Sequence, residues 1–330
     1  MKKFKLLALA AIASVPLIFA QTSCSSNDAI GILLPAEHPA LDAAKDGFIK
    51  ALEDNGDDIS KVVVKNANGQ SDKLTILAKD LVSRSKLTLG IGTGASVALM
   101  GQEVNQGITK PLLFTAVTDP VDAGLVESAD NPSGFVCGTT DANPVEAQIS
   151  LIKEFNPEFD KLGIFYTSTE INSKVQADQA KNAAELQGIS VSVKTCTGTS
   201  DLAANIEALA GEEGLDAIYI PTDNNVAANM NTVKVAADNH GVLVVAGEEN
   251  QVKNGAHLTL SLDYYNLGYS TGVMAHEILA GNKNPTDYKV VPVPASDCAY
   301  VFSSANLADS HLSMSDTLLN AHDWKDISAE

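Results

Sequence analysis

The chain has 330 residues, enough for two domains of ordinary size, each with its own core. Its 22 Lys and Arg residues face 41 Asp and Glu residues, which gives a net charge of −19 at pH 7. Because a nucleic-acid backbone or an anionic lipid surface would repel so acidic a protein, we exclude nucleic acid as a partner.

The first residues have the pattern of a secretory signal. A basic start, Met1 to Lys5, precedes the apolar run 6–20, which has signal length and is too short for a membrane span. We therefore predict that residues 1–23 are a signal peptide and that the protein is exported. Cleavage after Ala20 would release a soluble protein. Cleavage before Cys24 resembles the processing of a bacterial lipoprotein, and on this prediction a lipid on Cys24 tethers a periplasmic or cell-surface protein to a membrane.

The chain then alternates strands with helices. The unbroken apolar run 29–34 predicts a strand buried on both faces, and apolar residues at helical spacing from Leu41 predict a helix that Pro39 opens. The unit repeats in the predicted strands 61–67, 87–92 and 111–117, in a predicted helix 71–84 capped by Ser71, and in a helix through Val97, Leu99 and Met100. Strands that alternate with helices across short turns predict a parallel sheet with helices on both faces.

A second set of units begins after Asp141. It comprises the predicted strands 161–167, 190–196, 217–220 and 242–246 and the predicted helices 143–155, 171–186, 201–210 and 226–239. A strand over 257–264, a helix over 266–280 and a strand over 290–293 would then pass back through both lobes. No Pro- or Ser-rich linker divides the halves, so we expect short crossings near Asp141 and Glu249 to form a hinge.

The predicted fold class is α/β, with two doubly wound, Rossmann-like lobes, a hinge and a central cleft. We expect lobe 1 to comprise residues 28–141 and 249–286, and lobe 2 to comprise residues 142–248 and 287–330. Cys137, Cys196 and Cys298 are widely separated and lack CxxC spacing, so they predict neither a zinc site nor a disulfide framework. We interpret them as small buried residues, and one disulfide between two of them remains open.

Polar residues follow the predicted strands. In a doubly wound lobe the carboxyl ends of parallel strands meet at one edge, so these residues would converge on the cleft. They are Glu37, His38, Thr93, Gly94, Ala95, Thr118, Asp119, Asp223, Asn224, Glu248, Asp263 and Tyr264. Acids outnumber bases in this set, which suits a ligand ammonium group, while threonine hydroxyls and helix amino ends suit a carboxylate. We therefore predict an amino-acid site.

Other interpretations of the same residues stay open. Any one of the strand-end side chains could cap the helix that follows it, and Glu37 and His38 could form a solvated turn. Enzyme motifs are weaker: Gly90 to Gly94 lacks GxGxxG spacing, His276 and Glu277 are not part of HExxH, and no GxSxG elbow occurs. Nothing supplies a nucleophile, so we predict no enzyme, no cofactor and no metal site.

The strand-end turns resemble bacterial ABC-transporter substrate-binding proteins for tryptophan and tyrosine, or for aromatic amino acids more broadly. The matching stretches are 37–44, 114–126, 144–146, 217–224, 252–256 and 262–269. The resemblance implies a type I periplasmic binding fold, an ABC permease as partner, and a cleft in which Glu248 meets the ligand ammonium and Thr93 and Thr118 hold its carboxylate. Gly94 replaces the proline that is usual in the family, and Leu260-Ser261-Leu262 replaces a more glycine-rich approach to Asp263. The pocket for the ligand side chain can therefore differ from that of the family.

We expect a monomer that binds tryptophan, tyrosine or phenylalanine for import. Two alternatives remain: a sensor that feeds a chemoreceptor or kinase, and a binder of a sugar or nucleoside. Only 5% of the residues are aromatic, which argues against assuming a cage of stacked rings around the ligand.

Overall fold

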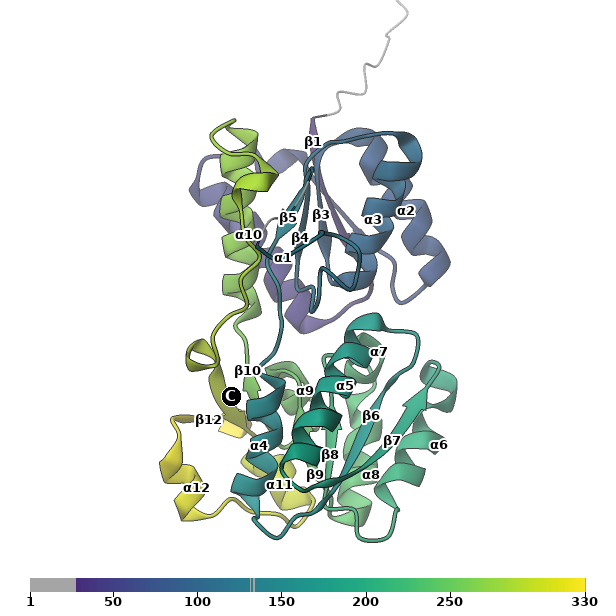
Figure 1. Ribbon diagram of the computed structural model, residues 1–330, viewed down its shortest axis with the longest axis vertical. Helices are drawn as coiled ribbons and strands as arrows, with labels where there is room; N and C mark the ends of the chain where they lie inside the picture. The colour runs from purple at the N-terminus through teal and green to yellow at the C-terminus, as the bar shows by residue number, and fades with distance from the viewer. Residues whose placement is uncertain (1–27, 131, 133, 330) are drawn as a thin grey trace, which may run out of the picture.

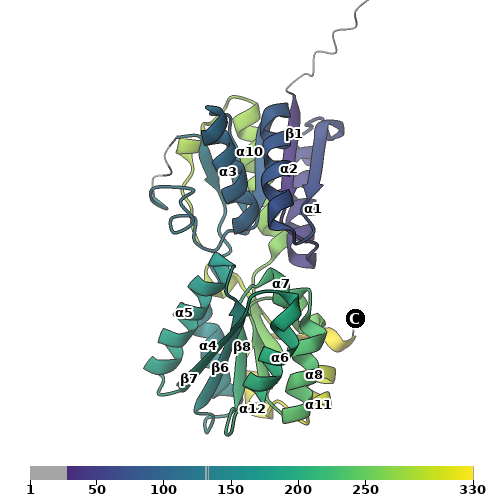
Figure 2. The ribbon, with the colours of Figure 1, turned by 90° about the vertical axis from the view of Figure 1, so that its right-hand side faces the viewer.

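The structure is a computed structural model that describes residues 28–130, 132 and 134–329. Two lobes are stacked along the long axis of the molecule, with the connecting segments between them (Figures 1 and 2). The predicted signal peptide and Cys24 lie outside the described residues. Within residues 28–130, 132 and 134–329, no helix has the length and apolar character needed to cross a membrane.

Lobe 1 is built on a five-stranded parallel sheet of order β2-β1-β3-β4-β5. Its strands are β1 (Ala29–Leu34), β2 (Val62–Asn66), β3 (Ser85–Ile91), β4 (Leu112–Thr115) and β5 (Val136–Gly138). Strand β1 pairs on both sides and is covered on both faces, which explains its unbroken apolar sequence. The predicted parallel sheet is confirmed for this lobe.

Helices cover both faces of this sheet. They are α1 (Pro39–Asp54), α2 (Ser71–Arg84), α3 (Thr93–Gln106) and α10 (Tyr264–Leu279), with 3₁₀ turns at Ile59–Lys61, Pro285–Asp287 and Ala295–Asp297. Helices α1 and α10 pack on one face around Phe48 and Leu267, and α2 and α3 pack on the other around Leu81 and Leu99. The predicted cap at Ser71 is wrong: the helix begins at Ser71, and the preceding Gln70 occupies the cap position without a side-chain hydrogen bond.

Helices α1 and α10 approach each other very closely. A Cβ atom on Gly268 would lie 1.8 Å from the carbonyl oxygen of Ala44, and one on Gly47 would lie 2.0 Å from that of Tyr265. Only glycine permits this contact. Because α1 begins just after His38 and α10 begins at Tyr264, the contact fixes these two side chains relative to each other.

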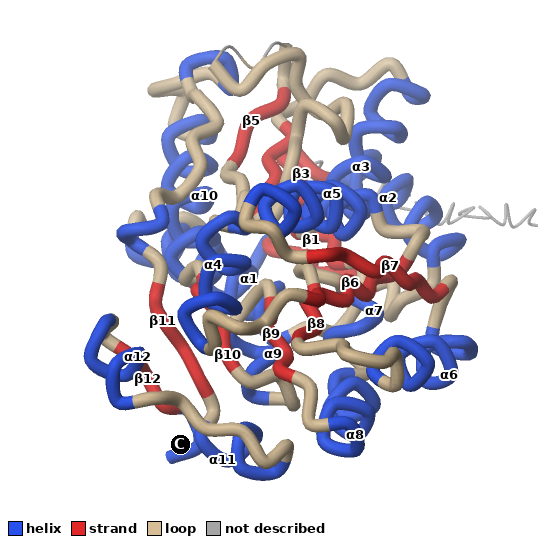
Figure 3. The backbone as a smooth tube through the Cα atoms, turned by 60° about the horizontal axis from the view of Figure 1, so that its bottom comes forward, coloured by secondary structure: helices blue, strands red, loops and turns tan. Residues whose placement is uncertain are grey.

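Lobe 2 contains a seven-stranded sheet of order β12-β11-β10-β9-β8-β6-β7 (Figure 3). Its strands are β6 (Lys161–Thr167), β7 (Ser190–Cys196), β8 (Ala217–Ile220), β9 (Leu243–Ala246), β10 (Leu258–Ser261), β11 (Ala299–Phe302) and β12 (Trp324–Asp326). All neighbours pair in parallel except β10 and β11. The antiparallel addition of β11 was not predicted.

The helices of lobe 2 also lie on both faces of its sheet. They are α4 (Val145–Phe155), α5 (Ile171–Leu186), α6 (Thr199–Ala210), α7 (Asn224–Ala227), α8 (Met230–His240), α9 (Glu249–Lys253), α11 (Ser304–Asp309) and α12 (Asp316–Ala321), with a final 3₁₀ turn at Ile327–Ala329. Helices α4 and α5 share one core with β6, and α6 and α8 share the other. The single helix predicted over 226–239 is two helices, α7 and α8.

The chain crosses from lobe 1 to lobe 2 between β5 and α4, close to Asp141 as expected, but it returns to lobe 1 at a different point from the one expected. Strand β10 pairs with β9 through Leu258 and Val245, so residues 249–261 belong to lobe 2, and the chain returns to lobe 1 only at Leu262, which packs in the core of lobe 1. The predicted strand 290–293 does not form, and Val290 instead packs in the core of lobe 1. Cys298 packs against both cores, which marks the last crossing before β11.

Candidate ligand-binding site

The strand ends of both lobes enclose two connected spaces. An inner chamber of about 20 Å³, the room of roughly one water molecule, lies beside the crossings, and an outer groove of about 860 Å³ continues from it. The chamber is lined by His38, Gly92, Thr93, Ala116 and Thr118 of lobe 1, by Asn172, Thr222, Asn224 and Glu248 of lobe 2, and by Asp141 and Tyr264 at the crossings, among others. Thr93, Asn172 and Asn224 line both spaces, so the two form one cleft.

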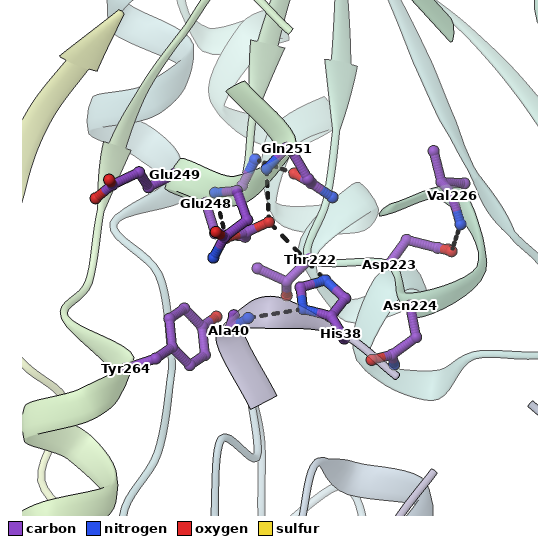
Figure 4. Close-up of polar contacts among 12 residues, drawn as sticks. His38, Ala40, Thr222, Asp223, Asn224, Val226, Glu248, Glu249, Gln251 and Tyr264 are labelled. Carbon is purple, nitrogen blue, oxygen red and sulfur yellow. Dashed lines mark hydrogen bonds and ion pairs between the residues drawn. The ribbon is translucent and has the colours of Figure 1, made fainter. Parts of the chain in front are cut away.

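Glu248 and His38 face each other across the lobes (Figure 4). Glu248 caps α9, because its carboxylate accepts hydrogen bonds from the backbone N–H groups of Asn250 at 2.7 Å and Gln251 at 2.8 Å. His38 caps α1 through Nδ1, which accepts from the N–H of Ala40 at 3.1 Å. A ring nitrogen that accepts is unprotonated, so the network assigns the proton of His38 to Nε2, which lies 3.9 Å from Oε1 of Glu248.

A buried acid sits where the chain crosses between the lobes. Both oxygens of Asp141 accept hydrogen bonds, one from the Thr118 hydroxyl at 3.0 Å and one from the Tyr264 hydroxyl at 2.9 Å. Burial nevertheless raises the pKa of the Asp141 carboxyl above its ordinary value, while these two donors oppose the rise. In this arrangement the hydroxyl proton of Thr118 is directed to Asp141 and not into the chamber.

The amino end of α3 also borders the chamber, through Gly92 and Thr93. Its cap residue, Gly92, has φ of 82° and no side chain, so no side-chain oxygen covers the first N–H groups of this 14-residue helix. The Thr93 hydroxyl is buried and has no hydrogen-bond partner among the described residues. Unpaired N–H groups at a helix start, with a free hydroxyl beside them, favour an anionic ligand group.

One residue of the chamber wall holds a strained backbone. Ala116, directly after β4, has φ of 54°, in the left-handed region that non-glycine residues rarely adopt. Strain of this kind persists where the surroundings enforce it and clusters at ligand sites. It lies two residues before Thr118 and lines the same chamber.

Several predicted site residues lie elsewhere. Asp223 is fully buried and caps α7, and its oxygens accept from the Thr167 N–H at 2.6 Å, the Thr167 hydroxyl at 2.8 Å and the Val226 N–H at 2.8 Å. It points away from Glu248 and toward Val226 (Figure 4). All of its partners belong to lobe 2, so its role is to join β6 to α7, and the helix-capping interpretation applies to it.

Three further positions are also local. Asp119 accepts from the N–H groups of Val121 and Asp122 within its own turn, and exposed Asp263 caps α10 through the N–H of Asn266. Ala95 is buried in the core between the sheet and α3 and lines neither space. Glu37 and Gly94 line the outer groove but not the inner chamber. The remaining predicted residues, His38, Thr93, Thr118, Asn224, Glu248 and Tyr264, lie together around the inner chamber.

The chamber includes residues that the sequence did not single out. Asp141 stood out only as a crossing, yet its carboxylate is the buried acid of the chamber. Thr222 precedes Asp223 in a strand-end run that was recognised, and Gln176 of α5 donates to the Thr222 hydroxyl at 2.6 Å. Asn172, which donates to the carbonyl of Thr222 at 2.7 Å, follows the end of β6. Neither this strand end nor that of β7, whose following residues 197–199 line the outer groove, is among the predicted site positions.

A Ser–His–Asp chain exists in lobe 2, but its polarity is wrong for catalysis. His257 is buried, and its Nδ1 accepts from the N–H of Val244 at 2.7 Å, so Nε2 donates to the Ser310 hydroxyl at 2.9 Å. Ser310 in turn donates to Asp238 at 2.6 Å. Burial lowers the pKa of His257 to about 4, and a ring that donates to the serine cannot take its proton. Among the described residues, no group of three or more His, Cys, Asp or Glu side chains is arranged to hold a metal ion.

Comparisons with known proteins agree with this geometry. A family profile described as ABC transporter substrate binding protein matches residues 29–323. The tyrosine-binding protein of Clostridioides difficile (strain R20291) is 35% identical over 301 residues, which cover 85% of each chain. The crystal structure of an ABC domain in complex with L-Trp from Streptococcus pneumonia is 28% identical and covers 89% of this chain and 99% of that one, with a TM-score of 0.82.

A second solved structure is a ligand-free, open form. This structure, of a substrate binding protein with adhesive properties from Clostridium difficile, is 32% identical and covers 91% of this chain and 99% of that one, with a TM-score of 0.67. The L-Trp complex therefore superimposes better on the present structure in spite of its lower identity.

Proposed function

Because this chain belongs to the ABC transporter substrate binding protein family, we propose that it binds an aromatic amino acid between its lobes and delivers it to an ABC permease. The family is one of binding proteins, so the chain is a solute-binding protein and not an enzyme, and it acts outside the cytoplasm. The predicted two-lobed α/β fold is confirmed by the likeness to solved structures of binding proteins, among them the L-Trp complex.

The single observation that carries the proposal is that acids and anion-binding groups line the same inner end of the cleft. Two buried acids, Glu248 of lobe 2 and Asp141 at the crossing, border it together with the uncapped amino end of α3 and the free Thr93 hydroxyl. A free amino acid carries an ammonium and a carboxylate on one carbon, and these two groups match the two kinds of lining. A sugar or nucleoside has neither group, so it would leave both acids without a cationic partner.

The geometry modifies the roles that resemblance assigns. Glu248 keeps its role as the partner of the ammonium, and we assign Asp141 to the same group. Thr93 keeps the carboxylate, together with the N–H groups of α3. Thr118 acts through Asp141, because its hydroxyl proton is already donated there. The aromatic character of the ligand is supported by the names of the relatives, which mention tyrosine and L-Trp.

Closure of the lobes explains how loading could be communicated. A ligand held by Glu248 from lobe 2 and by α3 from lobe 1 draws the lobes together, expels water and strengthens its own charge contacts. The closed pair of lobes would then present one surface to the permease. An uptake assay separates this role from sensing: loss of the gene should abolish uptake of labelled ligand, and normal uptake would favour the sensor.

We further propose that the mature protein is a monomer anchored by lipid on Cys24. Only a few residues separate Cys24 from β1, so the tether would hold lobe 1 close to the membrane. Replacement of Cys24 by Ser should move the protein from the membrane fraction to the soluble fraction. Mass spectrometry of the mature amino terminus checks the same proposal, and an unmodified terminus at Gln21 would contradict it.

The binding proposal is tested by calorimetry. Protein stripped of ligand by unfolding and refolding is titrated with each of the twenty standard amino acids. We expect one or more of tryptophan, tyrosine and phenylalanine to bind with micromolar or tighter affinity and acidic, basic and small amino acids to bind far more weakly. If none of the twenty binds more tightly than millimolar, the proposed function is wrong.

A further inference from the structure

The outer groove must receive whatever part of the ligand extends beyond the head group. The inner chamber offers about 20 Å³ and the groove about 860 Å³, a size found for sites of drug-sized molecules. Thr93, Asn172 and Asn224 border both spaces, and they mark the point where a ligand would pass from one to the other. Because the chamber has room for about one water molecule, a head group held by Glu248 and α3 would lie at the junction of the two spaces, and its side chain would extend into the groove.

The groove has apolar side chains on both walls. Leu74 of α2 and Val97 of α3 come from lobe 1, and Ile171 at the start of α5 comes from lobe 2. Among the described residues that line the groove, none is aromatic and none is cationic. A ligand ring would thus lie between aliphatic side chains, without an aromatic partner to stack on.

Side-chain amides form much of the remaining lining. Asn225 and Asn229, from the region of α7, are already engaged: Asn225 accepts from the Thr199 hydroxyl at 2.8 Å, and Asn229 donates to the carbonyl of Asn225 at 2.7 Å. Asn68 and Gln70, from the turn before α2, are exposed and leave their amides for a ligand. Amides both donate and accept hydrogen bonds and carry no charge, so these two can pair with a polar group at the far end of a ring.

The acids of the groove do not change this character. Glu37 is exposed to solvent. Glu170 is already engaged, because its oxygens accept hydrogen bonds from the backbone N–H groups of Asn224 and Asn225, both at 3.0 Å. Apart from exposed Glu37, the groups that the groove offers to a ligand side chain form neutral hydrogen bonds.

We infer that the groove selects aromatic amino acids whose ring carries a neutral hydrogen-bonding substituent over those with a plain ring. The aliphatic walls hold the ring, and the amides pair with a hydroxyl group at its far end. The inference rests on the proposed function and adds to it the chemistry that distinguishes one aromatic ligand from another. It assigns specificity to the residues of the groove and leaves head-group binding to the inner chamber.

Matched ligand pairs test the inference on the unmodified protein. Calorimetry compares L-tyrosine with L-phenylalanine and 5-hydroxy-L-tryptophan with L-tryptophan. Each hydroxylated ligand is expected to bind about two- to tenfold more tightly than its partner, the gain from one neutral hydrogen bond. Equal affinities within both pairs would overturn the inference and leave amino-acid binding intact. Absence of binding by all four ligands would overturn the proposed function itself, and with it the inference.

A variant locates the effect in the groove. Asn68 has φ of 52°, so Asn68→Gly keeps the backbone while removing the amide, and Gln70→Ala removes a side chain that does not cap α2. The double variant should lose most of the preference for tyrosine while its affinity for phenylalanine is unchanged. Gln106→Ala, an exposed amide at the far end of α3, is the control and should keep the preference. A preference that survives in the double variant, with its thermal stability retained, would contradict the assignment to these amides.

Discussion

Replacing Glu248 by Gln is the sharpest test of the inner chamber. The substitution keeps the size of the side chain and removes its charge. Glu248 is 1% exposed, so a ligand ammonium beside it has little water to share its charge. Glu249, the next residue, supplies the control, because its carboxylate pairs with Lys253 at 3.0 Å and Lys325 at 3.2 Å and lies away from His38 (Figure 4).

The expected magnitude follows from the contacts. A hydrogen bond to a buried charged group contributes about 1.5 to 3 kcal/mol, so Glu248→Gln should weaken ligand binding about 10- to 150-fold. The variant keeps an amide oxygen that can accept from one of the two N–H groups of α9, and losing the other bond should cost about 1 kcal/mol of unfolding free energy. Glu249→Gln should change the dissociation constant less than about threefold, because its ion pairs are partly exposed.

The assay pairs each protein with two ligands, the amino acid that binds best and its analogue without the amino group. In the wild-type protein, removing the ammonium should cost nearly the full interaction with Glu248. In Glu248→Gln the same removal should cost much less, and calorimetry measures this difference as a coupling free energy. If both proteins lose the same factor when the ammonium is removed, Glu248 does not contact it, and the charge argument for the chamber fails.

Three further predictions concern the stability of the fold. Burial raises the pKa of Glu103 to about 7 from its ordinary 4.5, so the unfolding free energy of the wild type should fall as pH rises from 4.5 through 7. Denaturant titration should show that Glu103→Gln is more stable than the wild type by up to about 3 kcal/mol at pH 8 and equally stable at pH 4. A variant that is no more stable at pH 8 would refute the buried-acid reasoning. Gly268→Ala should lower the unfolding free energy by about 3 kcal/mol, because its Cβ would meet the carbonyl of Ala44. The control Gly101→Ala has open space around it and should raise the unfolding free energy by about 0.5 kcal/mol. Equal melting temperatures of the two variants would contradict the packing argument. Asp223→Asn should lower the unfolding free energy by about 2 kcal/mol yet change ligand affinity of the folded protein less than about threefold, and a large loss of affinity measured by calorimetry would return Asp223 to the binding site.

The elements of the fold were readable because each is encoded locally. Strands β6, β7 and β8 have the predicted bounds, since short apolar runs between turn residues have few alternatives when helices follow at once. Helices α2 and α5 likewise begin and end where periodicity indicates. The carboxyl-end rule then predicted a cleft at one edge of each sheet without any tertiary information, and the two connected spaces of the structure lie at those edges.

The lobe boundaries could not be predicted from local sequence in the same way. Whether the strand after α9 returns to lobe 1 or stays in lobe 2 depends on the pairing of Leu258 with Val245, which local sequence does not encode. The antiparallel strand β11 also depends on pairing, through contacts such as Leu258 with Phe302. Both features are fixed by long-range hydrogen bonds and shared cores.

The amino-acid sequence by itself determined the architecture, the acidity of the molecule and a set of strand-end polar residues, six of which line the inner chamber. Only the tertiary structure decided which of them face the cleft. Glu248 and Asp223 have the same local role, since each caps the helix after its strand, but Glu248 faces His38 of the other lobe while Asp223 is enclosed by Thr167 of its own. A cap is specified by the three residues that follow it, whereas exposure to the cleft is specified by how two separate cores are held against each other. Asp141 and Tyr264, 123 positions apart in the chain, meet for that second reason alone.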